Sequence, residues 1–273
     1  MTITRATAPD APSRGVAAGL LVQLGLLAGL SATVGIGVAG WLAGLAYGLV
    51  LTGALAVGAR RAGLRRLGAA NVVTLSRALL VGGVTALVAY SIQRPAPTGV
   101  LVALVAVALA LDGVDGQVAR RTGSTTALGA RFDMEVDAFL ILVLSVYVAG
   151  PLGWWTVAMG AYRYVFVAAS WALPWLSRAL PPRFSRKVVA AAQGVALVVA
   201  TAGILPTAVN FAVVLAALVS LTWSFGRDIA WLWRTEQAHR AAHTATLGVP
   251  ALGAPNLVVA PIRRRPIPAS VGA

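Results

Sequence analysis

Long apolar segments, separated by short polar connections, fill most of the 273-residue chain. A helix needs about 20 apolar residues to cross a bilayer. Eight segments approach or exceed that length, at roughly 15–36, 39–58, 73–92, 98–118, 130–150, 153–174, 187–205 and 208–226. The pattern predicts an all-α fold, a polytopic bundle of membrane helices.

The composition agrees with a membrane protein. Hydrophobic residues make up 59% of the chain and charged residues only 11%, which is well below the charged fraction of a soluble domain. The net charge of +14 could indicate nucleic-acid binding, but basic connections are usual in membrane proteins, so we predict no nucleic-acid partner. The absence of cysteine excludes disulfides, thiol nucleophiles and thiolate metal sites.

The basic residues predict the topology. They fall in alternate connections between the apolar segments, and the intervening connections hold only Arg94. Because cytoplasmic loops carry the excess of basic residues, we expect these connections and both termini on the cytoplasmic side of the cell membrane. The residues are Arg60, Arg61, Arg65, Arg66, Arg120, Arg121, Arg178, Arg183, Arg186, Lys187, Arg227 and Arg234.

Five of the eight acidic residues lie between positions 112 and 137. Asp112 and Asp115 are three residues apart and Asp133 and Asp137 are four apart, so each pair shares one face of a helix. Carboxylates near a membrane are costly and mark functional sites. If the two helices are neighbours, the four carboxylates converge, and oxygen ligands favour hard cations such as Mg²⁺, Mn²⁺ or Ca²⁺.

Three interpretations of this cluster remain open. Two metal ions in one carboxylate cluster suit phosphoryl transfer. An Asp–Arg network could instead only hold two helices together. A cation transporter is a further alternative, although its carboxylates would be spread through the depth of the membrane rather than gathered at one end.

The acidic block resembles the signature of the CDP-alcohol phosphotransferases, integral membrane enzymes that make phospholipids. The eight fixed positions of that signature match with the same spacing, at Asp112, Asp115, Gly116, Ala119, Arg120, Gly129, Asp133 and Asp137. Asn71-Val-Val-Thr74 resembles the start of the family's first core helix.

The resemblance implies a six-helix catalytic core, which we place at 71–235, with a cavity that faces the cytosol. Two extra transmembrane helices at 15–59 and an interfacial amphipathic helix at 60–70 would precede this core. Polar segments at 1–14 and 236–273 would flank it, the second of them partly disordered.

The resemblance also implies roles for individual residues. Asp112, Asp115, Asp133 and Asp137 would hold two Mg²⁺ or Mn²⁺ ions, and Asp137 would also act as the general base on the acceptor hydroxyl. The CDP-activated donor would be bound by Asn71, Thr74, Gly116, Arg120, Thr126 and Gly129.

The implied reaction moves a phosphatidyl group from CDP-diacylglycerol to a small polar alcohol and releases CMP. Transfer of a phospho-alcohol from a CDP-alcohol to diacylglycerol stays open. We expect four basic residues to bind a phosphate on the acceptor: Arg77, Arg163, Arg186 and Lys187. Arg163 has the alternative of pairing with Glu135.

Glycines recur every fourth residue in the second apolar segment, at Gly40, Gly44 and Gly48. Such spacing lets helices approach closely. It favours packing within the chain, and a homodimer is the alternative.

Overall fold

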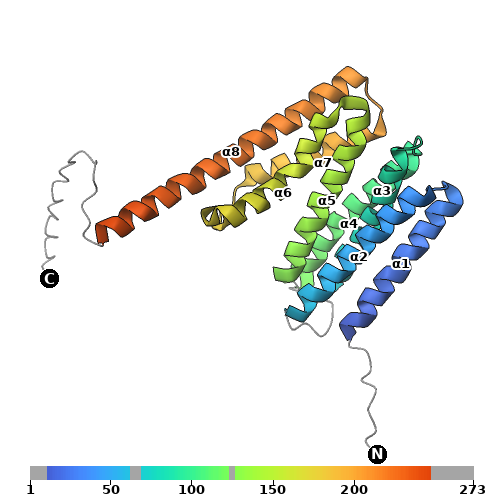
Figure 1. Ribbon diagram of the computed structural model, residues 1–273, viewed down its shortest axis with the longest axis horizontal. Coiled ribbons are helices and arrows are strands. Elements are labelled where there is room, and N and C mark those ends of the chain that lie inside the picture. Colours follow the sequence, from blue (N-terminus) through green and yellow to red (C-terminus); the bar gives the residue numbers. More distant parts are fainter. Residues whose placement is uncertain (1–10, 62–68, 123–126, 247–273) are drawn as a thin grey trace, which may run out of the picture.

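The computed structural model describes residues 11–61, 69–122 and 127–246, which contain helices and no strand. Figure 1 shows them as a bundle from which the last helix projects. The predicted all-α fold is confirmed. The helices are α1 (Ala11–Thr33), α2 (Gly37–Arg61), α3 (Ala69–Ser91), α4 (Thr98–Thr122), α5 (Ala127–Leu152), α6 (Val157–Ala172), α7 (Phe184–Ala202) and α8 (Thr207–Thr246), with short 3₁₀ turns η1 (Trp154–Thr156) and η2 (Pro174–Ser177).

Each of the eight predicted apolar segments contains a long helix. Five helical stretches are long and apolar enough to cross a membrane: 37–58, 74–91, 129–152, 184–202 and 207–243. In α1 and α4 the apolar stretches are shorter, Ala17–Thr33 and Thr98–Asp112, when only the residues with described side chains are counted. The predicted segment 153–174 is divided into η1, α6 and η2, because Gly153 takes a positive φ of 103° and Pro174 begins the second 3₁₀ turn.

Helix α3 lies at the centre of the bundle and packs against α1, α2, α4 and α5. Its close contact with α1 and α2 depends on Gly44, where an added Cβ would lie 2.5 Å from Leu27 Cδ2 and 3.3 Å from Ala86 Cβ. At least this glycine of the predicted small-residue pattern therefore serves packing within the chain. A homodimer stays a prediction.

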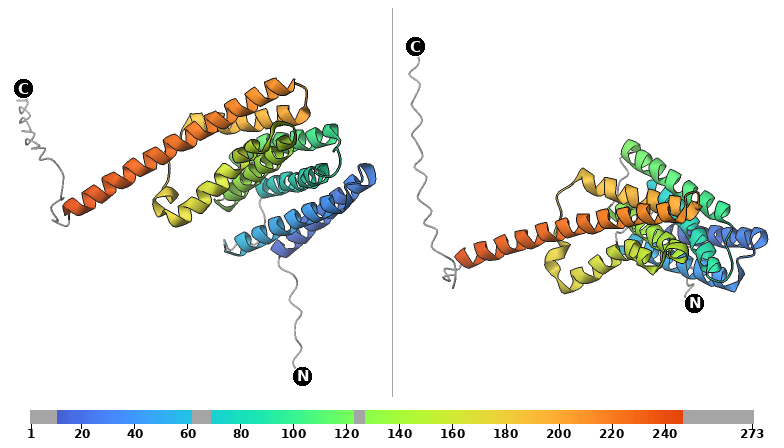
Figure 2. Two further views of the ribbon diagram at one scale, coloured as in Figure 1. Left: turned by 45° about the horizontal axis from the view of Figure 1, so that its top comes forward. Right: turned by 90° about the horizontal axis from the view of Figure 1, so that it is seen from above.

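Helix α8 packs mainly against α7 and then continues far beyond the bundle, as Figure 2 shows in two views. It is 40 residues long and reaches Thr246, so its end falls within the segment that the sequence predicted as a polar tail. An ion pair ties this extension to η2, since Arg178 Nη2 lies 2.6 Å from Glu236 Oε2. A second pair within the helix joins Arg240 and Glu236 at 2.8 Å.

Two predicted elements fall largely outside the described residues. They are the interfacial helix, of which 62–68 is not described, and the segment 1–14, of which only 11–14 is described. The same holds for 247–273 of the predicted tail.

Candidate active site

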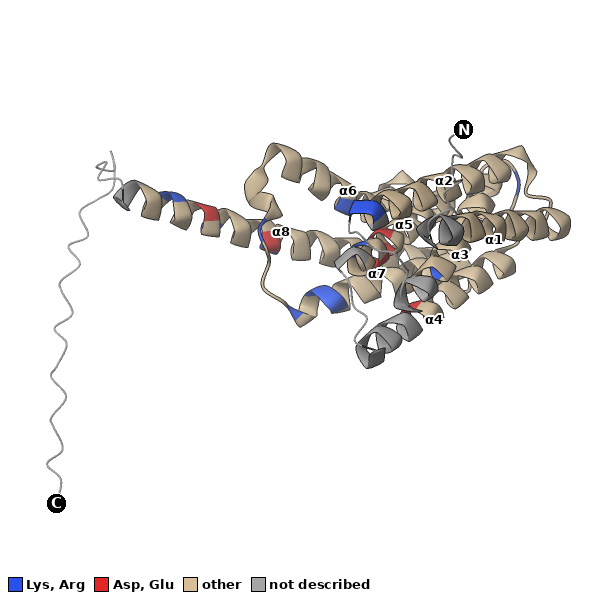
Figure 3. Ribbon diagram, turned by 90° about the horizontal axis from the view of Figure 1, so that it is seen from below, with Lys and Arg blue, Asp and Glu red and all other residues tan. Residues whose placement is uncertain are grey.

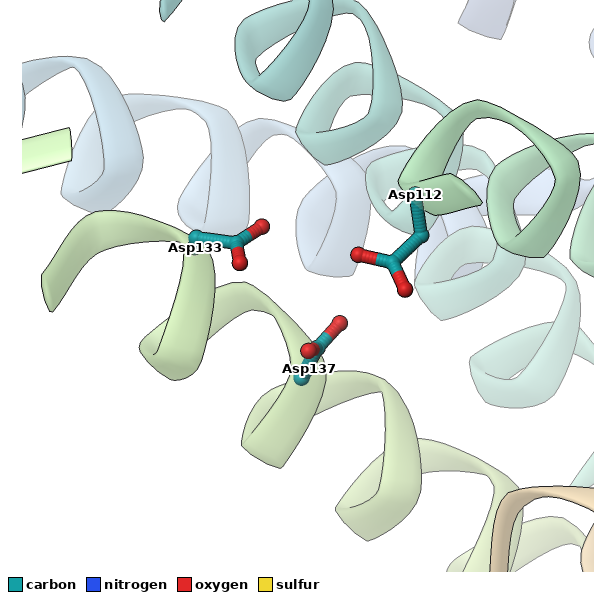
Figure 4. A group of neighbouring side chains, drawn as sticks. All are labelled: Asp112, Asp133 and Asp137. Atoms are coloured by element: carbon teal, nitrogen blue, oxygen red, sulfur yellow. The ribbon is translucent and has the colours of Figure 1, made fainter. Parts of the chain in front are cut away.

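Three aspartates from two helices meet at one end of the bundle. Asp112 lies in the second half of α4, and Asp133 and Asp137 lie one turn apart near the start of α5. One carboxylate oxygen of each lies within 4.8 Å of the others, and Figure 4 shows the three side chains pointing toward one another. The structure thus brings together three of the four aspartates that the sequence singled out; the side chain of Asp115 lies outside the described part of α4.

Buried Arg77 of α3 contacts all three aspartates. Its Nη1 contacts Asp112 Oδ1, its Nη2 contacts Asp133 Oδ1, and Nη2 lies 3.2 Å from Asp137 Oδ1. Arg77 is only 1% exposed, whereas the three aspartate side chains are 36–48% exposed. The carboxylates are therefore backed by one buried cation and open on the other side. From the sequence we predicted that Arg77 binds a phosphate on the acceptor, and that role stays a prediction.

The possible metal ligands of the cluster fit a hard divalent cation. In the part of the chain that the structure describes, they are all carboxylate oxygens. Oxygens bound to one Mg²⁺ or Ca²⁺ ion at about 2.1–2.4 Å lie at most about 4.2–4.8 Å apart, and the three aspartates meet that limit. Asp112, Asp133 and Asp137 could hold such an ion with small side-chain adjustments.

Two of the predicted donor-binding residues lie within one turn of the cluster. Thr74 is buried on α3 and precedes Arg77 by three residues. Gly129 precedes Asp133 by four residues on α5. Thr126 lies outside the described residues, and the side chains of Asn71, Gly116 and Arg120 are not described. The roles of all six in donor binding stay predictions.

Arg163 of α6 pairs with Glu135 of α5, which is the alternative that the sequence left open. Its Nη2 contacts Glu135 Oε1 and its Nε donates to Glu135 Oε2 at 3.2 Å. Because two residues advance a helix by about 200°, Glu135 and Arg163 lie on the opposite side of α5 from Asp133. A role for Arg163 in binding the acceptor stays a prediction.

A second ionic group joins the start of α7 to the middle of α8. Arg186 Nε lies 2.9 Å from Asp228 Oδ2, and Arg227 donates to Ser185 Oγ at 2.9 Å. Asp228 is buried, while Lys187 is exposed. Sequence reasoning missed Asp228, although a single acidic residue after a long apolar run was a usable signal.

These charged groups share one end of the bundle. Figure 3 shows charged residues gathered where α5 begins, with almost none at the opposite end. Helices α3, α5 and α7 start at this end, and α4 finishes there. The three aspartates could hold a cation there, and Arg77, Arg163 and Arg186 are each paired with a carboxylate.

A model of the family described as CDP-alcohol phosphatidyltransferase matches residues 67–223, which is more than half of the chain. The chain belongs to the CDP-alcohol phosphatidyltransferase family. The matched region contains the aspartate cluster, Arg77, Arg163 and Arg186. The family is named for a transferase activity, and membership in it does not favour the transporter alternative.

A curated relative agrees with this family. Over 51 residues the chain is 47% identical to mouse (Mus musculus) "Ethanolaminephosphotransferase 1", a match that covers 17% of this chain and 13% of the relative. The similarity is thus confined to a small part of both proteins. The comparison with solved structures found no match.

Proposed function

We propose that this family member transfers a phosphatidyl group from CDP-diacylglycerol to a small polar alcohol that carries a phosphate, with release of CMP. The convergence of Asp112, Asp133 and Asp137 within 4.8 Å is the observation that carries the proposal. It would give a site for divalent cations to a protein that has five helices long and apolar enough to cross a membrane in its described part.

The chain's own residues act in three ways in this proposal. Asp112, Asp115, Asp133 and Asp137 hold two Mg²⁺ or Mn²⁺ ions, which would stabilise negative charge on the diphosphate. Asp137 accepts the proton of the acceptor hydroxyl, whose oxygen then attacks the β-phosphorus. The bond from that phosphorus to the bridging oxygen breaks, and CMP leaves. The donor is held by Asn71, Thr74, Gly116, Arg120, Thr126 and Gly129.

The decisive experiment measures CMP release by purified protein. One set of reactions pairs CDP-diacylglycerol with a panel of alcohols, in Mg²⁺, Mn²⁺ or EDTA. We expect release only with a divalent cation, and loss of release in Asp133→Asn. Full activity after EDTA treatment would contradict the metal-dependent mechanism.

The opposite pairing of substrates is a second candidate, because the curated relative is named an ethanolaminephosphotransferase. Its donor would be a small CDP-alcohol and its acceptor diacylglycerol. A parallel set of reactions with CDP-ethanolamine and diacylglycerol tests it. CMP release in this set, and none with CDP-diacylglycerol, would reverse the proposed direction.

A phosphate on the acceptor is proposed because further basic residues lie on the two helices that follow α5 and pack against it. Arg163, Arg186 and Lys187 lie on α6 and α7, in addition to Arg77 on the cluster itself. A hydrogen bond to a charged group contributes about 1.5–3 kcal/mol, so Arg163→Ala should raise the acceptor KM about 10–100-fold. The donor KM should stay unchanged, as should both constants in Arg94→Ala at the far end. If inositol and glycerol serve as well as their phosphates, the acceptor carries no phosphate.

We also propose that the aspartate end of the bundle, with both termini, faces the cytoplasm. The chain has no cysteine, so single cysteines can be introduced on a clean background. Gln93 and Ser177 are both exposed and lie in connections of opposite predicted sidedness. An impermeant thiol reagent added to intact cells should label Gln93→Cys and spare Ser177→Cys. The reverse pattern would invert the topology.

A further inference from the structure

Arg77 is buried far more deeply than the other arginines near the site whose side chains the structure describes. It is 1% exposed, while Arg163 is 30% and Arg186 is 29% exposed. It contacts aspartates on two different helices, Asp112 on α4 and the pair on α5. Its Nη2 also donates to the Asp133 backbone carbonyl at 3.3 Å, which fixes the guanidinium to α5 itself.

The position of Arg77 is set by the packing of α3. Ala78 and Leu79 beside it are buried, and the apolar stretch 74–91 is 67% buried, the largest share among the candidate spans. A guanidinium that turned back along α3 would enter this apolar packing, which is costly for a charge. Arg77 is therefore held beside the carboxylates.

This fixed cation changes the electrostatics of the cluster. The three aspartates carry three negative charges when ionised, and Arg77 cancels one of them. Closely spaced carboxylates repel one another, so Arg77 lowers the cost of bringing them together during folding. The same positive charge repels any second cation that approaches the same carboxylates, and it repels a divalent ion twice as strongly as a monovalent one.

We propose that Arg77 is a built-in counter-cation that sets the affinity of the aspartate cluster for divalent ions by opposing them. It is a positioning residue, since it acts through the three carboxylates. The inference rests on the proposed function, in which those carboxylates hold metal ions. It assigns to Arg77 a task distinct from contact with either substrate.

Two effects of removing Arg77 oppose each other. Loss of its contacts leaves the carboxylate side chains less ordered. Metal binding is then weaker, because the side chains must be ordered when the ion binds. Loss of its charge removes the repulsion, which strengthens metal binding. The contacts are ion pairs to carboxylates that are 36–48% exposed and are therefore weakened by solvent, whereas the repulsion acts between a full charge and a doubly charged ion at close range. The charge effect should prevail, and Arg77→Gln should bind the first ion at least about tenfold more tightly.

The test is a titration of purified protein with Mn²⁺, in which free Mn²⁺ is measured by electron paramagnetic resonance. Wild type, Arg77→Gln, Arg77→Lys and Arg94→Gln are compared. We expect tighter binding in Arg77→Gln, and affinity within about threefold of wild type in the lysine variant because it keeps the charge. Arg94→Gln removes a charge from the connection that follows α3, far from the cluster, and should match wild type. Unchanged or weaker binding in Arg77→Gln would overturn the proposal.

Thermal unfolding gives a second, independent readout. In EDTA, Arg77→Gln should melt below wild type because its carboxylates lack their cation. Saturating Mn²⁺ should raise its melting temperature by more than that of wild type, since a tighter ligand stabilises more at equal concentration. An equal or smaller rise would contradict the proposal.

If Arg77→Gln does not fold, wild type still provides a test. In protein with ¹⁵N-labelled arginine, Mg²⁺ should shift the Arg77 Nε resonance over the concentrations that fill the site, with Arg94 unaffected. A static Arg77 resonance during saturation would overturn the proposal. Failure of the proposed function looks different, because wild type would then bind no Mn²⁺ and Asp133→Asn would change nothing.

Discussion

Helices α3 and α8 are both long and apolar, yet they lie in opposite surroundings. The apolar stretch of α3 is 67% buried within the protein, whereas that of α8 is only 28% buried. The more buried helix has the lower mean hydropathy of the two. In a membrane protein, hydropathy therefore marks contact with lipid as well as with the core, and it does not separate the two.

The difference lies in the kinds of residue that each helix carries. Helix α3 has small residues at its contacts, such as Ala78 and Ala86, and a buried arginine that faces three aspartates. Helix α8 exposes large apolar side chains, among them Val219 and Trp223. Without water in the hydrocarbon layer, helices associate through close packing and polar contacts, and α3 has both.

The largest expected effect tests whether catalysis depends on the aspartates that contact α3 and not on the acidic residues of α8. Asp137→Asn should lower the turnover rate about 10²–10⁴-fold, the usual contribution of a general base, with little change in donor binding. Turnover and the donor Kd are measured by CMP release and by equilibrium binding of CDP-diacylglycerol. Glu236→Gln removes an acidic group from the far part of α8 and should leave turnover unchanged. Loss of donor binding with a normal rate in Asp137→Asn would remove it as the base.

A second prediction tests close packing around α3 with two glycines. An added Cβ at Gly44 would meet Leu27 at 2.5 Å, while at Gly226 of α8 it would meet nothing within 4 Å. Gly44→Ala should destabilise the protein by about 1–3 kcal/mol through overpacking. Gly226→Ala should be neutral or stabilising, by up to about 1 kcal/mol, because alanine favours a helix. Thermal unfolding in detergent should show a lower melting temperature for Gly44→Ala and an equal or higher one for Gly226→Ala, and equal decreases in the two variants would contradict the comparison.

The smallest effects are expected from truncating one valine on each helix. Val84 of α3 is fully buried, and Val219 of α8 is 59% exposed. Val84→Ala leaves a cavity and should cost about 1–2 kcal/mol, between the usual costs of Ile→Val and Leu→Ala. Val219→Ala only exchanges contacts with lipid and should fall within about 0.5 kcal/mol. A larger cost at Val219 would mean that this face of α8 is covered by protein.

Much of this arrangement could be predicted from the sequence. Apolar length predicted a helix in each of the eight segments, and the spacing of Asp133 and Asp137 predicted that they would share one face of a helix. Both follow from local rules, because helix length and helix periodicity depend on neighbouring residues. The extension of α8 could not be predicted in this way, since it is joined to η2 by Arg178 and Glu236, which are far apart in the sequence.

The contact between Arg77 and the aspartates also could not be predicted from local rules. Arg77 is 35 residues from Asp112, and a sequence does not state which helix lies beside which. The same holds for Tyr47 of α2, whose ring stacks on Phe139 of α5 at a centroid distance of 4.8 Å. This contact joins one of the two extra N-terminal helices to the helix that carries Asp133 and Asp137. A pattern within either segment gives no sign of it.

The length of α8 can be compared with the thickness of a membrane. At 1.5 Å per residue its 40 residues extend roughly 60 Å, about twice the 30 Å thickness of a hydrocarbon layer. If α8 enters the layer at Thr207, the part from Thr207 to Asp228 spans roughly 33 Å, and the Arg186–Asp228 pair falls close to the other surface of that layer. Asp133 and Asp137 lie near the start of α5, just as Arg186 lies near the start of α7, and charged residues gather at that end of the bundle (Figure 3). A lipid whose tails lie beside these helices would therefore present its phosphates at the level of the carboxylates, without leaving the membrane.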